Sequence, residues 1–372
     1  MLNFLSSLAS RYSAALLVVI CLAMMLWIAP DAFRNPNFWA EDGTIFWKQS
    51  YDGWRSIIVP YGGYLNLVAR LGALAARAFP LAWTPAVFLA VAVLATVGTC
   101  LVIAKTIGPI AALAPVLAFG AEEPLANLTN VNWVMACGLL SVLAAGPLSP
   151  SAAIFSIFAG LSGPFSLLFS PVIAVRLYQA MKERRLTSAV YVLLLLEASV
   201  QLAFLVFTGR GPVGRQQPAP LHTMLELLSR AAGGEARLLL VTGMIAIGLA
   251  FTRDKRVAII VIYGGIIVAL AAVVRFLYAP DAFDRGGGQR YWYVPSAAML
   301  LVAASFAAAK ERTTLICGII LFVMISVPRN WFDPPRQVRL PDTSWPSAVA
   351  NAKSGPVEFT FPPGWKVVIP KQ

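Results

Sequence analysis

Long apolar runs are the feature that most limits what this chain can fold into. Most of them are about 15 to 22 residues long, which is the length at which an α-helix crosses a bilayer core of roughly 30 Å. Hydrophobic residues make up 59% of the 372 residues and charged residues 12%, about half the charged fraction of an average globular domain. Backbone groups in lipid must be hydrogen-bonded internally. The sequence therefore predicts an all-α polytopic membrane protein.

Eleven spans are expected. They cover residues 12–29, 84–104, 107–121, 131–146, 150–162, 164–180, 187–208, 236–252, 257–279, 294–309 and 313–328. Together they form one transmembrane domain over 1–328, whose first long external loop is 30–83. The tail 329–372 is expected to be a small external appendage, in which residues 357–361 alternate like a strand.

The placement of charge sets the expected orientation. The net charge is +12, but the basic residues cluster in short connectors at 182–185, 253–256 and 310–312. This positive-inside pattern argues against nucleic acid as the partner, puts the N-terminus inside and, with eleven spans, puts the C-terminus outside. Segments 30–83, 209–235, 280–293 and 329–372 then lie outside, where basic residues can meet anionic lipid or phosphate.

The segment 61–80 has two interpretations. Asn66, Arg70 and Arg77 recur a turn or two apart, which favours an amphipathic helix lying in the membrane interface. If the segment crossed instead, Lys105 and the loop 121–130 would change sides. The interfacial interpretation keeps Lys105 inside.

Two further features concern the spans. The short spans 150–162 and 164–180 meet at Gly163-Pro164, a break that is typical of helices lining a cavity, since bare backbone at membrane depth needs protein or water around it. The first apolar run lacks a signal-peptide cleavage site and is expected to stay as a span. All four cysteines fall inside apolar runs, so neither a disulfide nor a metal cluster is expected.

The acidic pair Glu41-Asp42 is the leading candidate for chemistry. It follows Trp39, a candidate substrate-binding residue, in the first external loop of a chain with few carboxylates. A carboxylate held between aromatic residues outside the membrane can act as a general base towards a sugar hydroxyl. The alternative is an exposed acidic turn that caps an interfacial helix.

Other polar groups are predicted to lie on the same side. Tyr61, Tyr64 and Arg70 suit sugar stacking or, more commonly, an interfacial aromatic belt. The loop 122–133 carries amides and an indole, which commonly bind sugar hydroxyls. The alternative is an ordinary polar turn between two spans. Its candidate binding residues are Glu122, Asn130, Asn132 and Trp133.

The late external loop offers a phosphate site. Three glycines at 286–288 allow close backbone approach, and Arg285 and Arg290 can fork onto a phosphate beside Gln289 and Tyr291. The alternative is a flexible loop with ordinary interfacial arginines. The basic loop 210–215 and the single His222 give a weaker signal. The sequence has no Walker loop, dinucleotide fingerprint, HExxH or serine elbow.

This pattern resembles the GT-C superfamily of multispanning glycosyltransferases, which use polyprenyl-phosphate-linked sugars. The segments 39–43, 63–65 and 289–291 are similar to those of uncharacterised bacterial members. The resemblance covers the first hundred residues best and the remainder as topology. It implies a bacterial inner-membrane protein with a cytoplasmic N-terminus and a periplasmic C-terminus. It also implies that a carboxylate of the first external loop is the base, here Asp42 with Glu41 as the alternate.

The expected activity is inverting transfer of a hexose or pentose from a polyprenyl-phosphate donor to an envelope glycan, lipid or protein. Arg290, helped by Arg285, would stabilise the departing phosphate. Membrane lipids are the other expected partner. No cofactor is expected, and nothing indicates a divalent metal, although Glu122-Glu123 could join Asp42 if folding brought them together.

Two alternatives remain. A transporter or flippase would use the Gly163-Pro164 break and ionisable residues inside its spans, for which Glu197 and Arg275 are the candidates. A glycan polymerase or ligase would share the topology, but the late external loop is small for that class.

Overall fold

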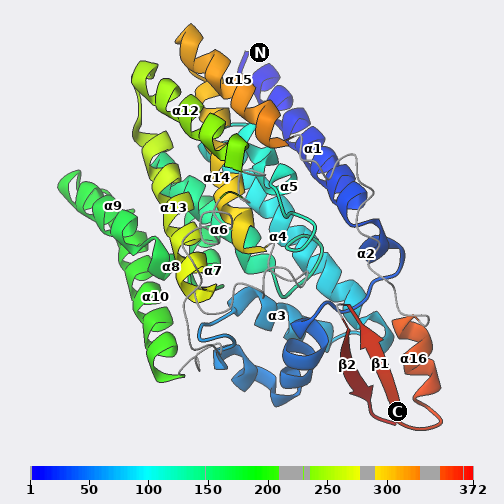
Figure 1. The fold of residues 1–372 in the computed structure, drawn as a ribbon. Helices are drawn as coiled ribbons and strands as arrows, with labels where there is room; N and C mark the ends of the chain where they lie inside the picture. The colour runs from blue at the N-terminus through cyan, green and yellow to red at the C-terminus, as the bar shows by residue number, and fades with distance from the viewer. Residues whose placement is uncertain are drawn as a thin grey trace.

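The computed structural model describes residues 2–146, 148–208, 229, 235–276, 290–326, 344–362 and 364–371. Helices dominate it, and the two termini lie at opposite ends of a helical bundle (Figure 1). The long helices are α1 (Leu2–Ile28), α4 (Thr84–Thr106), α6 (Val131–Ala145), α7 (Pro150–Gly160), α9 (Ser170–Lys182), α10 (Ser188–Phe207), α12 (Glu235–Phe251), α13 (Arg256–Phe276), α14 (Arg290–Ala307) and α15 (Arg312–Ser326).

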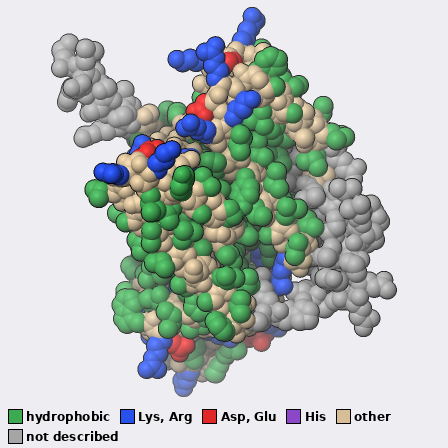
Figure 2. All heavy atoms as spheres, turned by 90° about the vertical axis from the view of Figure 1, so that its left-hand side faces the viewer, with side chains coloured by type: hydrophobic (Ala, Val, Ile, Leu, Met, Phe, Trp, Pro, Cys, Tyr) green, Lys and Arg blue, Asp and Glu red, His purple; other side chains and the backbone are tan. Residues whose placement is uncertain are grey.

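Within the described residues, three helical stretches are long and apolar enough to cross a membrane. They are Leu81–Thr106, Ser188–Phe207 and Arg256–Arg275. Large apolar side chains also face outwards, for example Leu94, Val206 and Val274, and a hydrophobic belt separates the charged ends of the molecule (Figure 2). These features indicate a helical protein that associates with a membrane. The count of eleven spans is not confirmed, because the expected span 107–121 is not a continuous helix.

The expected span 107–121 is wrong as a helix. It contains only η4, a 3-10 turn at Ala111–Leu113, and the four-residue α5 (Ala114–Leu117). Gly108 and Gly120 have positive φ angles, and Pro115 removes a donor from the middle of the segment. The segment is nevertheless mostly buried.

Helix α14 bonds part of the exposed backbone of that irregular segment. Tyr293 Oη donates to the Pro115 carbonyl at 2.7 Å, and the Phe119 N–H donates to Ser296 Oγ at 2.9 Å. Irregular backbone is tolerated at membrane depth when protein surrounds it. Apolar composition predicted burial correctly but could not distinguish a spanning helix from a packed irregular segment.

Helix α6 forms the centre of the bundle. Every residue from Val131 to Ala144 is buried, as expected for a helix that is apolar on all sides. Arg176 of α9 caps its C-terminus by donating to the carbonyls of Leu143 at 2.7 Å and Ala144 at 2.5 Å. A cation at this position also complements the negative end of the helix dipole.

The three basic connectors lie at the N-terminal end of the bundle, which we call the basic end. The connectors α12–α13 and α14–α15 meet there beside the end of α4, and Arg253 and Glu311 are 3.6 Å apart across them. The third connector joins α9 to α10, and Arg176 and Tyr191 on either side of it both donate to carbonyls at the C-terminal end of α6. Folding therefore gathers the connectors at one end, as the positive-inside interpretation predicted.

At the opposite end, segment 61–80 contains the ten-residue helix α3 (Leu67–Ala76). Such a helix rises only about 15 Å, too little to cross a bilayer core. Next to α3 are the 3-10 helices η2 (Ser50–Ile58) and η3 (Leu81–Trp83), and the five-residue α2 (Pro30–Arg34) precedes the acidic pair. These short elements support the interfacial interpretation of the segment.

The break at Gly163-Pro164 is filled by protein. It lies between α7 and the short α8 (Phe165–Leu168), and it pairs in strand fashion with the chain before α3. Gly163 N–H donates to the Leu65 carbonyl at 2.8 Å. From α10, the Gln201 side chain accepts from Leu65 N–H at 2.8 Å and donates to the Gly160 carbonyl at 3.3 Å. The break thus anchors the segment that carries Tyr61 and Tyr64.

The C-terminal appendage consists of α16 (Trp345–Asn351) and an antiparallel hairpin of β1 (Val357–Phe361) and β2 (Trp365–Ile369). The strand expected at 357–361 is confirmed. Alternate residues Phe359 and Phe361 point inwards with Val367 and Ile369 of β2. They join a buried cluster with residues of the first external loop, so the appendage is packed against that loop.

Candidate functional site

The acidic pair lies at the start of a short π-helix, η1 (Asp42–Trp47). Before it, Ala40 adopts a positive φ of 42°, which is unusual for a residue with a Cβ. Single π-turns and strained backbone both occur preferentially at functional sites. The backbone geometry therefore singles out the acidic pair as a candidate functional site, as the sequence analysis does.

Asp42 is 1% exposed, and both of its carboxylate oxygens accept hydrogen bonds. Oδ1 accepts from Thr129 Oγ1 at 2.6 Å and from Thr129 N–H at 2.7 Å, and Oδ2 accepts from Trp39 N–H at 3.2 Å. Burial raises the pKa of Asp42 to about 7, although these hydrogen bonds oppose the shift. Asp42 thus ties the first external loop to the loop before α6.

Glu41 has a different environment. Its Oε1 accepts a 2.8 Å hydrogen bond from Tyr61 Oη. Its Oε2 is buried and has no hydrogen-bond partner in the part of the chain that the structure describes. Burial and the charge of Glu41 raise the pKa of Tyr61, so the phenol stays protonated and can donate this bond. Glu41 therefore presents one fixed oxygen and one open acceptor.

Arg290, at the start of α14, is held by Glu123. Its guanidinium Nη1 lies 2.8 Å from Glu123 Oε1, and its backbone N–H donates to Glu123 Oε2 at 2.9 Å. Burial lowers the pKa of Arg290, but the surrounding groups Tyr291, Glu123 and Glu41 outweigh it, so the pKa is raised. Glu41 also contributes to the raised pKa of Glu123, which is caused mainly by burial. One loop therefore bonds both groups, the acidic pair and Arg290, because Thr129 bonds Asp42 and Glu123 bonds Arg290.

Aromatic rings adjoin this charged group. Tyr291 packs edge-on against Trp133 at 5.1 Å between ring centroids, and Trp133 packs edge-on against Phe165 at the same distance. Arg290 lies over the Tyr291 ring at 5.3 Å. Beside Trp133, Asn132 Oδ1 is buried with no partner among the described residues. The tertiary structure thus brings Trp133, Asn132 and Tyr291 into one neighbourhood.

Some expected binding residues take part in the scaffold. Arg70 is buried, donates to Gln49 Oε1 at 2.5 Å and to the Val59 carbonyl at 2.9 Å, and lies over the Phe46 ring. Asn130 Nδ2 donates to the Glu123 carbonyl at 3.3 Å and so shapes its own loop.

The other expected binding residues lie as follows. The backbones of Tyr61 and Tyr64 pair with each other. Trp39 is half-buried and contributes its backbone N–H to Asp42. Glu122 is half-buried beside Glu123. Arg285 and Gln289 lie outside the described residues, as do His222 and the loop 210–215.

Sequence reasoning chose Glu122 rather than Glu123 as the binding residue, and it missed Thr129. Glu123 belongs to the same acidic pair as Glu122, so the sequence contained a signal but not the choice between the two. Thr129 contacts Asp42 across 87 residues of sequence, and a threonine in a polar loop carries no local sign of that contact. No group of three or more His, Cys, Asp or Glu that could hold a metal ion occurs among the described residues.

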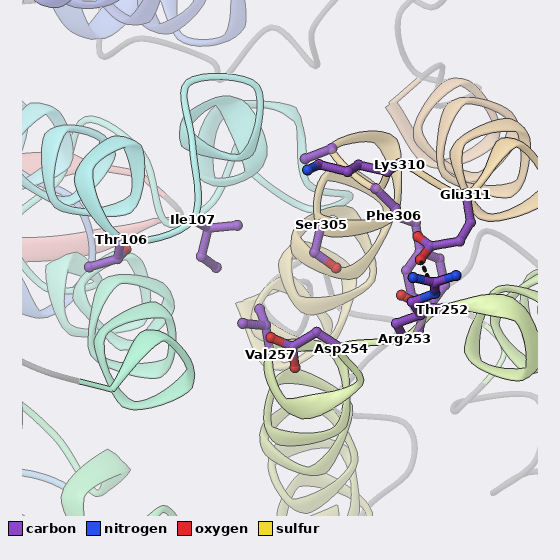
Figure 3. A pocket seen from close by; sticks show the side chains of 12 residues that line it. Thr106, Ile107, Thr252, Arg253, Asp254, Val257, Ser305, Phe306, Lys310 and Glu311 are labelled. Carbon is purple, nitrogen blue, oxygen red and sulfur yellow. Dashed lines mark ion pairs between the residues drawn. The ribbon is translucent and has the colours of Figure 1, made fainter.

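A hollow of about 690 Å³ lies at the basic end, away from the acidic pair. Figure 3 shows Thr106, Asp254, Lys310 and the Arg253–Glu311 pair around it. Its carboxylates already have partners, since Asp254 also accepts from Arg256 N–H at 3.1 Å. We therefore place the candidate site at the end with the acidic pair.

No model of a known protein family matches the chain, and a search of curated proteins finds no match. The functional argument therefore rests on the geometry described above.

Proposed function

We propose that the protein is a membrane glycosyltransferase of the GT-C type. It transfers a sugar from a polyprenyl-phosphate donor to a hydroxyl of an envelope glycan, lipid or protein at the periplasmic face of the bacterial inner membrane. The observation that carries the proposal is Glu41 Oε2, a buried acceptor with no partner among the described residues, on a carboxylate whose charge helps to raise the pKa of Arg290. A proton acceptor beside a fixed cation is what transfer of a sugar from a phosphate requires.

Glu41 is the proposed base, and Asp42 positions it. Both oxygens of Asp42 are occupied by Thr129 and Trp39, whereas Glu41 Oε2 has an open lone pair. This assignment reverses the order of preference that the family resemblance implied. Tyr61 fixes the other oxygen of Glu41, which orients the open one.

The reaction exchanges one bond at the anomeric carbon. Glu41 Oε2 accepts the proton of the acceptor hydroxyl while the hydroxyl oxygen forms a bond to the anomeric carbon. The bond from the anomeric carbon to the phosphate oxygen breaks, and its electron pair leaves with the lipid phosphate. Attack from the face opposite the leaving group inverts the configuration. Arg290, oriented by Glu123, stabilises the charge that develops on the phosphate.

The proposed sugar-binding groups are Asn132, Trp133 and Tyr291. Buried acceptors without partners, such as Asn132 Oδ1 and Glu41 Oε2, suit a ligand that is rich in hydroxyl donors. Aromatic rings nearby suit the apolar faces of a sugar.

An apolar groove supports a lipid-linked donor. It measures about 340 Å³ and is lined from α12, α13 and α14, including Pro295, Ala298 and Met299. Along α14, Pro295 is five residues from Arg290, a rise of about 7.5 Å. An isoprenoid chain in this groove would keep its phosphate near the Arg290 guanidinium.

One observation favours a second function, a transporter or lipid-linked glycan flippase. Glu197 is buried within α10, and its Oε2 has no partner among the described residues. An ionisable residue inside a membrane helix is a common mark of a transport pathway. Movement of a lipid-linked sugar across liposomes without any covalent product would favour this function.

Binding of undecaprenyl phosphate to the purified protein tests the phosphate site without knowledge of the sugar. Arg290→Gln should weaken binding by about tenfold or more, since it removes a charged, forked donor. Glu41→Gln should leave binding near wild type. The exposed Glu358→Gln is the matched control. Equal binding by all four proteins would overturn the phosphate assignment.

Transfer is tested with a panel of polyprenyl-phosphate hexoses and pentoses and an envelope lipid extract as acceptor. Glu41→Gln should lower the rate by about 10²- to 10⁴-fold, the usual contribution of a general base. Asp42→Asn should have a smaller effect. Full activity of the double variant Glu41→Gln, Asp42→Asn would contradict the proposed mechanism.

A further inference from the structure

The C-terminal hairpin packs directly on the segment that carries the acidic pair. Trp345 of α16 packs edge-on against Phe38 with ring centroids 4.7 Å apart, and Phe361 of β1 packs on Phe38 at 5.8 Å. The Trp345 indole N–H donates to the Leu81 carbonyl at 2.8 Å. Phe38, Trp345 and Phe361 are all buried. The appendage and the first external loop therefore share one core.

The hairpin also bonds the strained turn before Glu41. Ala40 has a φ of 42°, a conformation that an alanine avoids unless surrounding contacts hold it. Its N–H donates to the Pro362 carbonyl at 2.8 Å, at the tip of the hairpin. This bond joins the residue next to Glu41 to a residue more than 300 positions later in the chain.

Gly43 meets the hairpin on the other side of the acidic pair. A Cβ at this position would lie 2.8 Å from Cζ of Phe361 and 2.9 Å from Cδ2 of Phe38. The Phe361 ring therefore occupies the space that any other residue at position 43 would need. Together, the Pro362 carbonyl and the Phe361 ring flank Glu41 and Asp42.

From these contacts we propose that the C-terminal hairpin is a positioning element of the carboxylate site, in which Phe361 and Pro362 hold the turn that presents Glu41. The effect of the hairpin on catalysis rests on the proposed function, whereas its contact with residues 40–43 does not depend on that function. Phe361 and Pro362 act through the backbone of residues 40–43 and are positioning residues. The appendage is thus part of the site although its sequence contains none of the reacting groups.

The direct test is hydrogen exchange at the amides of residues 39–47 in the full-length protein. Phe361→Ala should speed exchange at 40–43 by about tenfold or more, because it removes the packing that holds this turn closed. The matched control is Val368→Ala, on the outward face of the same hairpin and 54% exposed, which should leave exchange unchanged. Phe361→Leu should recover most of the protection.

If Phe361→Ala fails to fold, two variants at the other side of the contact, Gly43→Ala and Gly43→Ala with Phe361→Leu, test the same interaction. Gly43→Ala alone should clash with the Phe361 ring and speed exchange at 40–43. Adding Phe361→Leu relieves the clash with the Phe361 ring but not the 2.9 Å approach to Phe38, so it should recover part of the protection. Effects of contacting residues that depart from additivity in this way identify a direct interaction.

The kinetic readout separates positioning from simple loss of fold. Phe361→Ala should lower kcat by about tenfold with the donor KM unchanged, because misplacing the base affects the chemical step and Arg290 is held by other elements. Unchanged exchange at 40–43 in a folded Phe361→Ala variant would overturn the proposal, whatever the transfer rates, and so would a Gly43→Ala variant that recovers no protection when Phe361→Leu is added. Faster exchange together with full activity of Glu41→Gln would retain the contact and reject the proposed function instead.

Discussion

Tyr61 Oη donates a hydrogen bond of 2.8 Å to Glu41 Oε1, leaving the other oxygen of this buried carboxylate open. Tyr61 belongs to the segment that pairs with the broken helix at Gly163. The orientation of Glu41 is therefore set by the helical bundle as well as by its own loop.

Tyr61→Phe tests that orientation. The ring would remain, but the hydrogen bond to the carboxylate would be lost, and such charged bonds contribute about 1.5–3 kcal/mol. We expect transfer to fall by about 10- to 100-fold, since each 1.36 kcal/mol is a factor of ten. Tyr51→Phe, at an exposed tyrosine of the same loop, should retain activity. Equal rates for both variants would show that Tyr61 does not orient the base.

Glu123 and Arg290 should be coupled in stability. Removing one partner of a buried ion pair leaves an uncompensated charge, at a cost of about 3–5 kcal/mol when both are fully buried. Because the Arg290 side chain keeps 21% exposure, we expect about 2–3 kcal/mol for Glu123→Gln. The double variant Glu123→Gln, Arg290→Gln should cost less than the sum of the single variants, measured by thermal unfolding in detergent.

The surface pair Glu358–Lys366 provides the comparison for this cycle. Its side chains are 57% and 60% exposed, and exposed pairs contribute about 0–1 kcal/mol. A coupling between Glu123 and Arg290 no larger than that of the surface pair would mean that the site does not depend on their contact.

Asp42 should make stability depend on pH. Its pKa is raised to about 7 in the folded protein, whereas an unfolded aspartate titrates at about 3.9. Between about pH 4 and 7 the folded state keeps a proton that the unfolded state has released. The free energy of unfolding should therefore fall as the pH rises through this window and level off above it.

Thermal unfolding of the detergent-solubilised protein from pH 4.5 to 8 measures this slope. Asp42→Asn should make it shallower, with the contribution of Glu123, whose pKa is also raised by burial, remaining. Glu358→Gln, at an exposed acidic residue, should leave the slope as in the wild type. An unchanged slope in Asp42→Asn would assign the pH dependence to another group.

The two ends of the bundle should face opposite sides of the membrane. All four native cysteines are buried, so a new surface cysteine can be labelled selectively. A membrane-impermeant maleimide should label Ser354→Cys, beside the hairpin, in intact spheroplasts. It should label Lys182→Cys, at the basic end, only after permeabilisation. Labelling of both positions from the same side would contradict the orientation and the periplasmic site.

Much of the architecture followed from sequence because it depends on local pattern. Apolar runs predicted the helices, the alternation at 357–361 predicted β1, and clustered basic residues predicted one basic end. Segment 107–121 was mispredicted because a buried irregular segment is as apolar as a helix. Its Pro115 carbonyl and Phe119 amide are hydrogen-bonded by Tyr293 and Ser296, residues far away in the chain.

The candidate groups for chemistry could be identified from the sequence: scarce carboxylates at Glu41-Asp42, an arginine at 290 and aromatic residues near both. Which of these groups remain available depends on how the helices and loops pack. Both oxygens of Asp42 accept hydrogen bonds, from Thr129 and Trp39, whereas Glu41 Oε2 has no partner among the described residues. Glu123, rather than Glu122, is the ion-pair partner of Arg290. Composition and periodicity report the environment of a residue along its own element. Hydrogen bonds across 87 and 167 residues depend on how the elements pack together.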